Sequence, residues 1–305
     1  MSIRVSVVIP MYRASAWIEA TLDSVVRQTY PAENIEIIAI DDASPDDSAA
    51  VATEFLARHP HESRVVRQTQ NGGLPATRNA GYRLATGSWI QFLDQDDLLA
   101  PHKLALQVAA VESAPPDVAV VYSNWQYFVL KDGQWQGSGE LHAPQVDDDP
   151  VLRIVEEFDF ATVGPCLIRA SFLERIGGFE LAPNLGEDTD LMLRLARAGG
   201  RFREAHSKEV AFLYRQLPGS LAGAYGKNKV AMRNLLETFR AVESFWRKTN
   251  AGSELSERQR LALAKRYSRF AHVYLEHDPE AYSLIETWLA GLGFERPIVS
   301  TPKPE

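Results

Sequence analysis

Three carboxylates lie within four residues in the run Asp94-Gln95-Asp96-Asp97, directly after an apolar segment at residues 89–93. Carboxylates this close repel one another unless a cation joins them. Mg²⁺ and similar hard cations take oxygen ligands, and they often connect one or two carboxylates to the phosphates of a substrate. The run is therefore a candidate metal–phosphate site, although solvated loops and helix caps also contain acidic runs of this kind.

A second acidic run, Glu187-Asp188-Thr189-Asp190, begins a segment with Leu191, Leu193 and Leu195 that we expect to be a helix. A carboxylate held near a hydroxyl group can take up its proton and make the oxygen a nucleophile. Acidic residues in the first turn of a helix also favour the helix dipole without any catalytic role. The residues alone leave both interpretations open.

Strands and helices alternate over the first hundred residues, and two acidic runs, 41–42 and 94–97, directly follow expected strands. We expect strands at residues 5–9, 35–40, 64–68 and 89–93. We also expect four helices: one capped by Ser15, one capped by Ser44, one that runs from residue 74 to a stop at Gly87, and one that starts at Pro101. Repeated units of this kind predict an α/β fold with a mostly parallel, doubly wound sheet. Ligands of such sheets bind beyond the carboxyl ends of the strands, where Asp41-Asp42 and the 94–97 run fall.

The remaining pattern is less regular. We expect a hairpin turn at residues 131–133, a helix from residue 187, a last strand at 210–214 and helices beyond residue 225. No internal repeat is visible. The helical stretch after residue 225 therefore reads as an extension that differs from the α/β part before it.

Composition narrows the class of protein. The chain has 305 residues, of which 45% are hydrophobic and 24% charged, as in globular proteins. Its net charge of −8 divides into −11 over residues 1–224 and +3 over residues 225–305. Because nucleic-acid binding needs clustered cations, we expect no such partner. A single cysteine, no leader pattern and no apolar run of about 20 residues predict a cytoplasmic protein, leaving contact with the inner face of a membrane open.

Four motifs occur in order: VSVVIPMY at 5–12, DDASPD at 41–46, NGGLPATRN at 71–79 and LDQDD at 93–97. Together they resemble the family-2 glycosyltransferases, whose nucleotide-binding fold is called GT-A. The resemblance covers roughly residues 3–220. It implies a catalytic domain over residues 1–224, with a nucleotide-binding half (1–98) and an acceptor-side half (99–224), and leaves 225–305 as a helical C-terminal extension.

The resemblance also implies an activity. The protein would move a sugar, with inversion, from a nucleoside diphosphate, UDP first among them, to a hydroxyl of a saccharide or glycolipid in polysaccharide or glycoconjugate synthesis. Pro10 and Tyr12 would lie against the nucleoside. Asp41 or Asp42 would hydrogen-bond the uracil-like base.

The implied diphosphate site uses the third and fourth motifs. Arg78 would face the base or the diphosphate, as suits a permanently charged planar donor, and Asp94 would contact the ribose. Asp96 would bind Mg²⁺ or Mn²⁺, which neutralises the leaving diphosphate as a Lewis acid. Asp97 and Arg215 are expected to support this site.

The run at 187–190 matches the Glu-Asp motif that such enzymes place near the acceptor. By that resemblance Asp188, with Glu187 beside it and Asp190 in support, would take the proton from the attacking hydroxyl opposite the leaving group. One departure concerns the last strand, where many relatives have Tyr-Arg-x-His and this chain has Leu217 in place of the histidine. Either the metal keeps fewer protein ligands, or Arg215, Gln216 or His206 compensates.

Other readings compete with this one. A non-catalytic nucleotide-sugar-binding scaffold is hinted at by Leu217. A dinucleotide oxidoreductase is disfavoured, because Pro10-Met11-Tyr12 follows the first strand where that fold requires a glycine-rich turn. The extension leaves three roles open, namely homo-oligomerisation, peripheral membrane docking and acceptor binding. The aromatic residues of the acceptor-side half either stack on a sugar or simply pack: Trp125, Tyr127 and Trp135.

Overall fold

The computed structural model of the chain describes residues 2–144, 149–157, 162–181, 186–217, 229–274 and 278–298. They divide into two units, each built from separate stretches of the chain. Unit 1 comprises Met1–Asp148, Thr162–Leu181 and Arg194–Pro218, and unit 2 comprises Asp149–Ala161, Ala182–Leu193 and Gly219–Glu305. The boundary expected between residues 224 and 225 lies outside the described residues.

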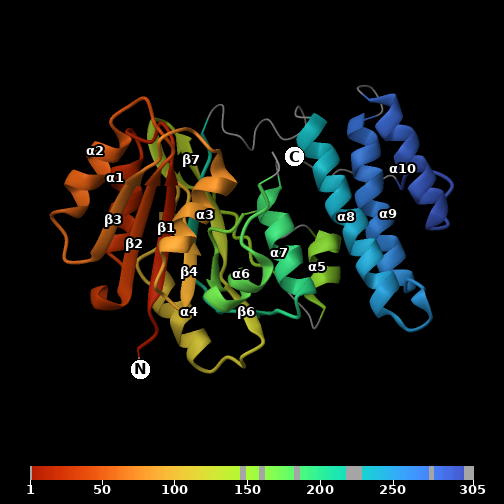
Figure 1. The fold of residues 1–305 in the computed structure, drawn as a ribbon, viewed down its shortest axis with the longest axis horizontal. Coiled ribbons are helices and arrows are strands. Elements are labelled where there is room, and N and C mark those ends of the chain that lie inside the picture. The colour runs from red at the N-terminus through yellow and green to blue at the C-terminus, as the bar shows by residue number, and fades with distance from the viewer. Residues whose placement is uncertain are drawn as a thin grey trace. The chain divides into compact units, whose positions relative to one another are not determined.

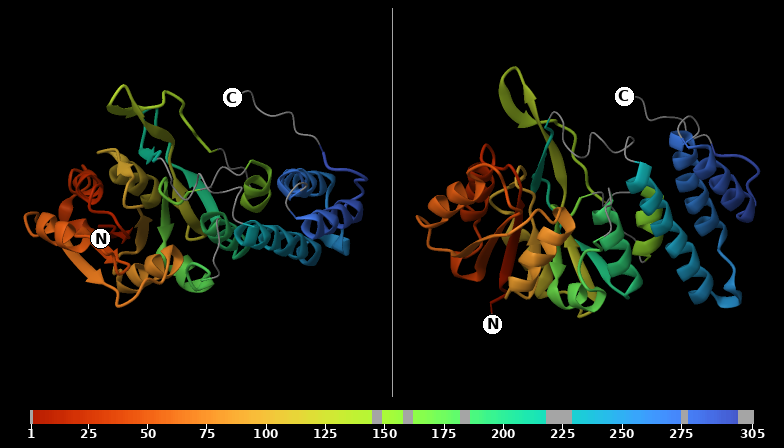
Figure 2. Two further views of the ribbon diagram at one scale, coloured as in Figure 1. Left: turned by 90° about the horizontal axis from the view of Figure 1, so that it is seen from above. Right: turned by 45° about the horizontal axis from the view of Figure 1, so that its top comes forward.

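A seven-stranded sheet forms the centre of unit 1, in the order β10-β6-β9-β4-β1-β2-β3 (Figure 1). All its pairings are parallel except those of β9 with β4 and β6. Helices lie on both faces of the sheet (Figure 2), which explains why its central strands are buried on both sides. The predicted α/β class is confirmed. The strands are β1 (Val5–Met11), β2 (Ile35–Asp41), β3 (Glu62–Arg67), β4 (Trp89–Phe92), β6 (Val118–Tyr122), β9 (Cys166–Arg169) and β10 (Arg201–Glu204).

The helices of unit 1 lie near their predicted positions, but three predicted helix ends are wrong. Ser15 and Ser44 cap no helix, because both serve the loops before α1 and α2; the hydroxyl of Ser44, for example, accepts the N–H of Arg13. Gly87 lies beyond the end of α3, and a side chain there would meet the backbone of Ser6 at 2.7 Å. The bounds are α1 (Ile18–Val26), η1 (Ala32–Asn34), α2 (Ser48–Leu56), α3 (Leu74–Leu84), α4 (Lys103–Glu112) and α6 (Ala170–Ile176).

A second, four-stranded sheet of unit 1 has the order β5-β11-β7-β8, with β5 (Leu98–Leu99), β7 (Trp125–Lys131), β8 (Gln134–Gly137) and β11 (Phe212–Arg215). The predicted hairpin at 131–133 joins β7 to β8, and Asp132 and Gly133 both have positive φ, as a two-residue turn requires. Figure 2 shows this hairpin extending from the rest of unit 1. The sheet itself is not among the sequence predictions.

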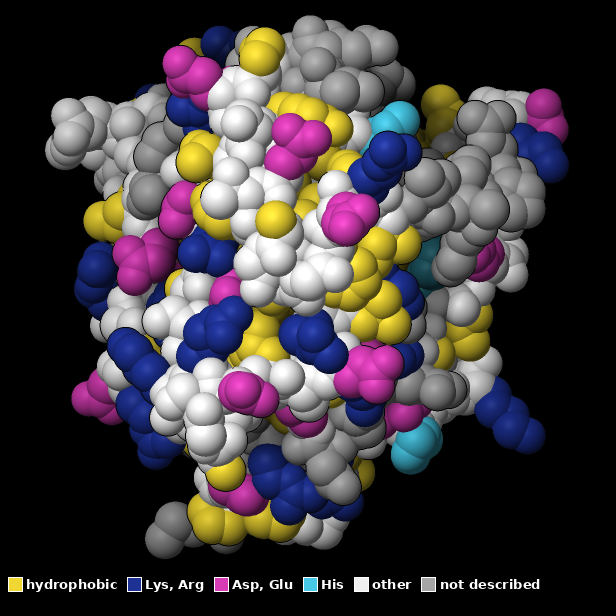
Figure 3. Space-filling model, turned by 90° about the vertical axis from the view of Figure 1, so that its right-hand side faces the viewer, with side chains coloured by type: hydrophobic (Ala, Val, Ile, Leu, Met, Phe, Trp, Pro, Cys, Tyr) yellow, Lys and Arg dark blue, Asp and Glu magenta, His cyan; other side chains and the backbone are white. Residues whose placement is uncertain are grey.

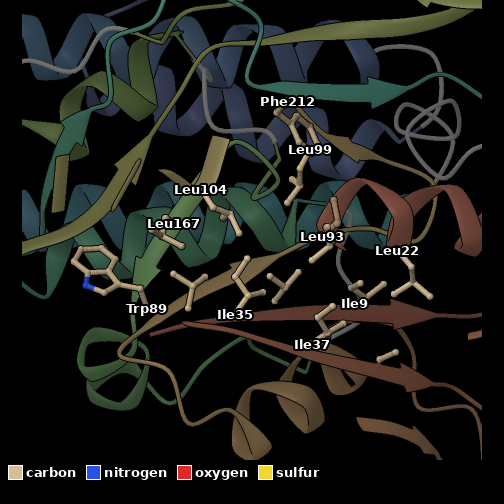
Figure 4. Packing of buried hydrophobic residues seen from close by; sticks show 14 of the residues in the cluster. Ile9, Leu22, Ile35, Ile37, Trp89, Leu93, Leu99, Leu104, Leu167 and Phe212 are labelled. Carbon is tan, nitrogen blue, oxygen red and sulfur yellow. The ribbon is translucent and has the colours of Figure 1, made fainter. Parts of the chain in front are cut away.

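The two sheets share one apolar core. Ile9 of β1 and Leu22 of α1 belong to the same cluster as Leu99 of β5 and Phe212 of β11 (Figure 4). The small sheet is therefore fixed to the main sheet by burial of large apolar side chains, each stabilising by about 1.5–3 kcal/mol. This packing holds β11 close to the end of β4.

Unit 2 is helical, with α5 (Pro150–Glu157), the first turns of α7 (Glu187–Arg197), α8 (Lys229–Thr249), η3 (Ala251–Ser253), α9 (Glu257–Tyr274) and α10 (Pro279–Gly291). One face of α8 is apolar and buried, and it includes Phe239 and Trp246. Basic and acidic side chains are mixed on the side that carries α10 (Figure 3). Among the described residues, no helix is long and apolar enough to cross a membrane.

Candidate active site

The strand ends bring the first, second and fourth motifs together. β1 lies between β4 and β2, Met11 pairs with Asp41 across β1 and β2, and the N–H of Asp42 donates to the carbonyl of Met11 at 2.8 Å. On the other side, the N–H of Leu93 donates to Val8. The residues predicted from these motifs therefore gather along one edge of the main sheet.

Asp42 binds the loop that precedes α3. Its Oδ1 accepts the N–H of Gly72 at 2.7 Å and the Gln68 amide at 2.8 Å, and its Oδ2 accepts the N–H of Gly73 at 2.9 Å. Both oxygens thus serve the chain's own donors. Gln68 is a residue that the sequence analysis missed, since a glutamine after a weak strand carries no special signal.

Asp41 is fully buried beside Asp42. Its Oδ2 accepts the N–H of Ser44 at 3.2 Å and lies 3.3 Å from Nε of Arg67. Its Oδ1 has no hydrogen-bond partner among the described residues. Of the two carboxylates after β2, Asp41 is the one with an unused oxygen.

Arg78 is 1% exposed and lies at the centre of a small network. Its Nη2 donates to Oδ1 of Asp94 at 2.7 Å, and its guanidinium lies 5.1 Å from the ring centre of Phe179. Asn79 holds that ring in place, because its side chain exchanges two hydrogen bonds with the backbone of Phe179, at 2.8 and 2.9 Å. Sequence analysis missed Asn79 and Phe179 as partners, since a hundred residues separate them.

Gln95, in the middle of the acidic run, connects two predicted sites. Its Oε1 accepts the N–H of Tyr12 at 2.6 Å, and its Nε2 donates to the carbonyl of Tyr12 at 3.0 Å. The backbone carbonyl of Gln95 accepts the hydroxyl of Thr21 at 2.8 Å. Tyr12, 39% exposed, is thereby held against the run that contains Asp94 and Asp96.

Asp96 and Asp97 lie in surroundings unfavourable to negative charge. Burial, followed by repulsion from Asp94, raises the pKa of Asp96 to about 6. Burial and the charges of Asp96 and Asp94 raise the pKa of the buried Asp97 well above its usual range. Oδ1 of Asp97 accepts the N–H of Arg215 at 2.8 Å, whereas Oδ2 has no hydrogen-bond partner among the described residues.

Arg215 is the cation beside this pair. Its Nε donates to the backbone carbonyl of Asp96 at 2.6 Å. The residue is 6% exposed, and its guanidinium packs over Trp17, Trp135 and Phe128, with centroid distances of 4.9, 4.8 and 5.5 Å. Burial lowers the pKa of Arg215, against the charges of Asp96 and Asp97. Trp135 therefore has a packing partner at the site, which the sequence left open.

A divalent cation fits this cluster. A positive charge between the two side chains would give the unpartnered oxygen of Asp97 a ligand and would lower the raised pKa of Asp96. Within the described ranges, no three His, Cys, Asp or Glu side chains form a ready metal cage. The donor set suits Mg²⁺ or Mn²⁺ that takes its other ligands from a substrate's phosphates and water.

Leu217 ends the described part of this region, and of the residues expected to compensate for it only Arg215 contacts the acidic run. His206 is exposed and pairs with Glu204 at 3.1 Å, and Gln216 is exposed with its N–H on Phe128.

The second acidic run starts α7, as predicted. Glu187, Asp188 and Asp190 lie in the first turn, and Asp188 is 6% exposed. These residues belong to unit 2, whereas the residues around Asp96 belong to unit 1.

Comparison with known proteins decides the family. Residues 6–176 match the family described as Glycosyl transferase family 2. The chain belongs to this family. The resemblance carried by the four motifs is therefore confirmed.

Curated relatives of this family-2 chain include proteins named as a glycosyltransferase and as a teichoic acid biosynthesis protein. It is 41% identical over 223 residues to the uncharacterized glycosyltransferase EpsJ of Bacillus subtilis (strain 168), covering 71% of this chain and 62% of EpsJ. It is 38% identical over 95 residues to the minor teichoic acid biosynthesis protein GgaB of the same organism, covering 31% of this chain. The chain spans less than two thirds of either relative, 62% and 10% of their lengths.

Solved structures show the same fold. S. aureus TarS in complex with UDP-GlcNAc has a TM-score of 0.65 at 18% identity, covering 92% of this chain and 75% of that one. The mannosyltransferase PcManGT from Pyrobaculum calidifontis, in complex with GDP-Man and Mn²⁺, has a TM-score of 0.60 at 19% identity, covering 96% and 76%. The GT-A fold of this family-2 chain is thereby confirmed.

Proposed function

We propose that the chain transfers a sugar from a nucleoside diphosphate, UDP foremost, to a hydroxyl of a saccharide or glycolipid, with inversion. The observation that carries this is the pair Asp96 and Asp97 at the end of β4, where the pKa of both carboxyls is raised although Arg215 lies beside them, and where Oδ2 of the buried Asp97 has no hydrogen-bond partner among the described residues. The solved neighbours bound to UDP-GlcNAc and to GDP-Man with Mn²⁺ support a metal-assisted nucleotide-sugar donor. A relative named for teichoic acid biosynthesis supports a role in surface polysaccharide or glycoconjugate assembly.

On the donor side, Pro10 and the partly exposed Tyr12 would lie against the nucleoside. Asp41 is the better base ligand of the pair after β2, because Oδ1 of Asp41 is unused while Asp42 holds the loop before α3. Asp94 would contact the ribose with its partly exposed side chain, held in place by Arg78. Gln95 would keep the nucleoside and diphosphate parts of the site in register.

At the reacting end, the protein supplies charges and a base. Mg²⁺ or Mn²⁺ held by Asp96, with Asp97 in support, would neutralise charge on the leaving diphosphate. Arg215, kept rigid by its aromatic neighbours, adds a permanent positive charge beside the same cluster. Asp188, flanked by Glu187 and Asp190, would remove the proton of the acceptor hydroxyl, and attack opposite the diphosphate inverts the anomeric carbon.

Two measurements test this function. Thermal unfolding against a panel of nucleotides and nucleotide sugars, with and without Mn²⁺, should show a metal-dependent rise for one nucleoside diphosphate, since a ligand at 100 times its Kd stabilises by about 2.7 kcal/mol. Release of that nucleoside diphosphate from the matching sugar donor should then be lost in Asp188→Asn. No shift with any nucleotide contradicts the donor site, and a shift without turnover in the wild type favours a non-catalytic scaffold.

A further inference from the structure

Unit 2 joins the start of α7 to helices from distant parts of the chain. It contains α5, the residues of α7 up to Leu193 and the helices α8, α9 and α10. The segment with the candidate base, which lies between stretches of unit 1 in the sequence, thus groups with the C-terminal helices. That grouping bears on the role of the extension.

α9 holds α5 by its charged and polar groups. Arg258 forms a bidentate pair with Glu156, with both N···O distances 2.7 Å. The buried Arg266 donates to the carbonyls of Val155 and Glu156, the latter at 2.9 Å. These carbonyls belong to the last turn of α5, where a helix favours positive charge. Two arginines of one helix therefore fix the end of another, which makes the extension an integral part of unit 2.

α8 contacts the residue that begins α7. Gly186 has φ of +105°, and a methyl group on it would lie 3.1 and 3.2 Å from the two terminal carbons of Leu235. Leu235 is buried against this position. The carbonyl of Gly186 accepts the N–H of Asp190 at 2.9 Å, the first hydrogen bond of α7. Leu235 therefore packs on the backbone from which the first turn of α7, and Asp188 in it, is built.

The start of α7 has little freedom of its own. Thr189 and the following apolar residues up to Leu193 are buried, and Asp188 is nearly so. The glycine at 186 can adopt many conformations unless its neighbours restrict it. A side chain packed on that glycine restricts the conformations open to the turn.

We infer that α8 serves the active site as a positioning element, in which Leu235 packs on Gly186 and thereby fixes the Asp188 carboxylate. This inference rests on the proposed function, in which Asp188 is the base. It assigns α8, a helix of the C-terminal extension, a role in holding the base. A base has to be held within a fraction of an ångström of its productive position, and a displacement of about 1 Å can cost about 10²-fold in rate.

The test compares two leucine truncations in the full-length protein. Leu235→Ala removes the contact with Gly186, and Leu289→Ala removes an equally buried leucine from α10 as the matched control. We expect Leu235→Ala to lower kcat about 10- to 100-fold while the Kd for the nucleoside diphosphate changes less than about 2-fold. The control should unfold at a similarly lowered temperature yet keep kcat within about 2-fold. Leu235→Met, which conserves volume, should restore most of kcat.

Hydrogen exchange gives a readout that does not depend on turnover. The N–H of Asp190, bonded to Gly186, should exchange faster in Leu235→Ala and unchanged in Leu289→Ala. Where Leu235→Ala does not fold, Leu235→Val serves in its place, with a smaller loss of kcat expected.

Two outcomes separate the inference from the function on which it rests. Equal kcat for Leu235→Ala and the control, or equal exchange at Asp190, overturns the inference while the proposed function stands. Turnover that survives in Asp188→Asn overturns the assignment of the base itself, whatever the leucine variants do.

Discussion

The carboxylates after β2 and those after β4 follow strands that both pair with β1, yet their surroundings are opposite. After β2, backbone N–H groups, Gln68 and Arg67 bind Asp41 and Asp42. After β4, the charges of Asp94, Asp96 and Asp97 oppose one another, and the pKa values of Asp96 and Asp97 are raised although Arg215 lies beside them. The comparison shows that acidic residues at strand ends need not share a role: Asp42 holds a loop through the chain's own donors, whereas the charges of Asp94, Asp96 and Asp97 oppose one another and suit a bound cation.

The largest effect is expected in the run after β4, where the charges of three carboxylates oppose one another. Asp96→Ala should lower turnover about 10³-fold, because the ion that neutralises the leaving group loses its ligand, a contribution of several kcal/mol. Its thermal stability without metal should stay the same or rise, since one of three mutually repelling charges is gone. Asp23→Ala, on the partly exposed side of α1, is the control. A large loss of metal-free stability in Asp96→Ala would contradict the contrast.

For Asp42, in contrast, we expect a substitution to lower the stability of the fold more than it lowers turnover. Asp42→Ala removes the acceptor of two backbone N–H groups and one amide, so denaturant unfolding should show a loss of about 1–3 kcal/mol. Asp42→Asn, which retains one carbonyl acceptor, should lose less. If Asp42→Ala is as stable as the wild type and only binds nucleotide less well, Asp42 is a ligand residue rather than a loop residue.

Gln95 offers a test of the connection between the two groups. Gln95→Ala breaks both hydrogen bonds to Tyr12, and at about 1 kcal/mol for a typical bond we expect nucleoside diphosphate to bind about 5- to 10-fold more weakly by calorimetry. The affinity of the Gln95→Ala protein for Mn²⁺, measured without nucleotide, should equal that of the wild type. Gln95→Glu keeps the acceptor but loses the donor, so an intermediate Kd is expected. Equal Kd values for all three proteins would show that the hydrogen bonds between Gln95 and Tyr12 do not contribute to nucleotide binding.

The smallest effect concerns Asp46, in the loop between β2 and α2. Burial opposes its ionisation, but hydrogen bonds from Ser48 and Ser15 outweigh this and lower the pKa of Asp46 to about 2. A carboxyl group whose folded pKa lies below its unfolded value of about 3.9 stabilises the fold above that pH, and the contribution disappears as pH falls towards 2. Asp46→Asn should thus unfold at a slightly lower temperature than wild type at pH 6, with the difference closing between pH 4 and 2. A difference independent of pH would contradict this.

Much of unit 1 is predictable because its signals are local. Apolar runs that end in polar clusters identify β1, β2 and β4, and parallel topology then requires Asp41 and Asp94 to share an edge. Helix ends are less predictable. Serine is a common capping residue, but the hydroxyl of Ser44 accepts a hydrogen bond from the N–H of Arg13 in another loop instead of capping α2.

The remaining features depend on contacts distant in sequence. The small sheet pairs residues 98–99 with 212–213, and no local pattern announces that pairing. In the sequence, Gln95 is only a polar residue between acidic ones, and its role becomes visible in its hydrogen bond with the backbone of Tyr12. The distinction between Asp42 and Asp96 depends on which donors surround each carboxylate, which residue type alone does not specify.

The central claim is that the run after β4, and not the pair after β2, binds the cation. Mn²⁺ titration followed by electron paramagnetic resonance, with nucleoside diphosphate present, measures this directly. We expect the wild type and Asp42→Asn to bind Mn²⁺ and Asp96→Ala to lose it. Retention of Mn²⁺ by Asp96→Ala, together with its loss in Asp42→Asn, would contradict the account.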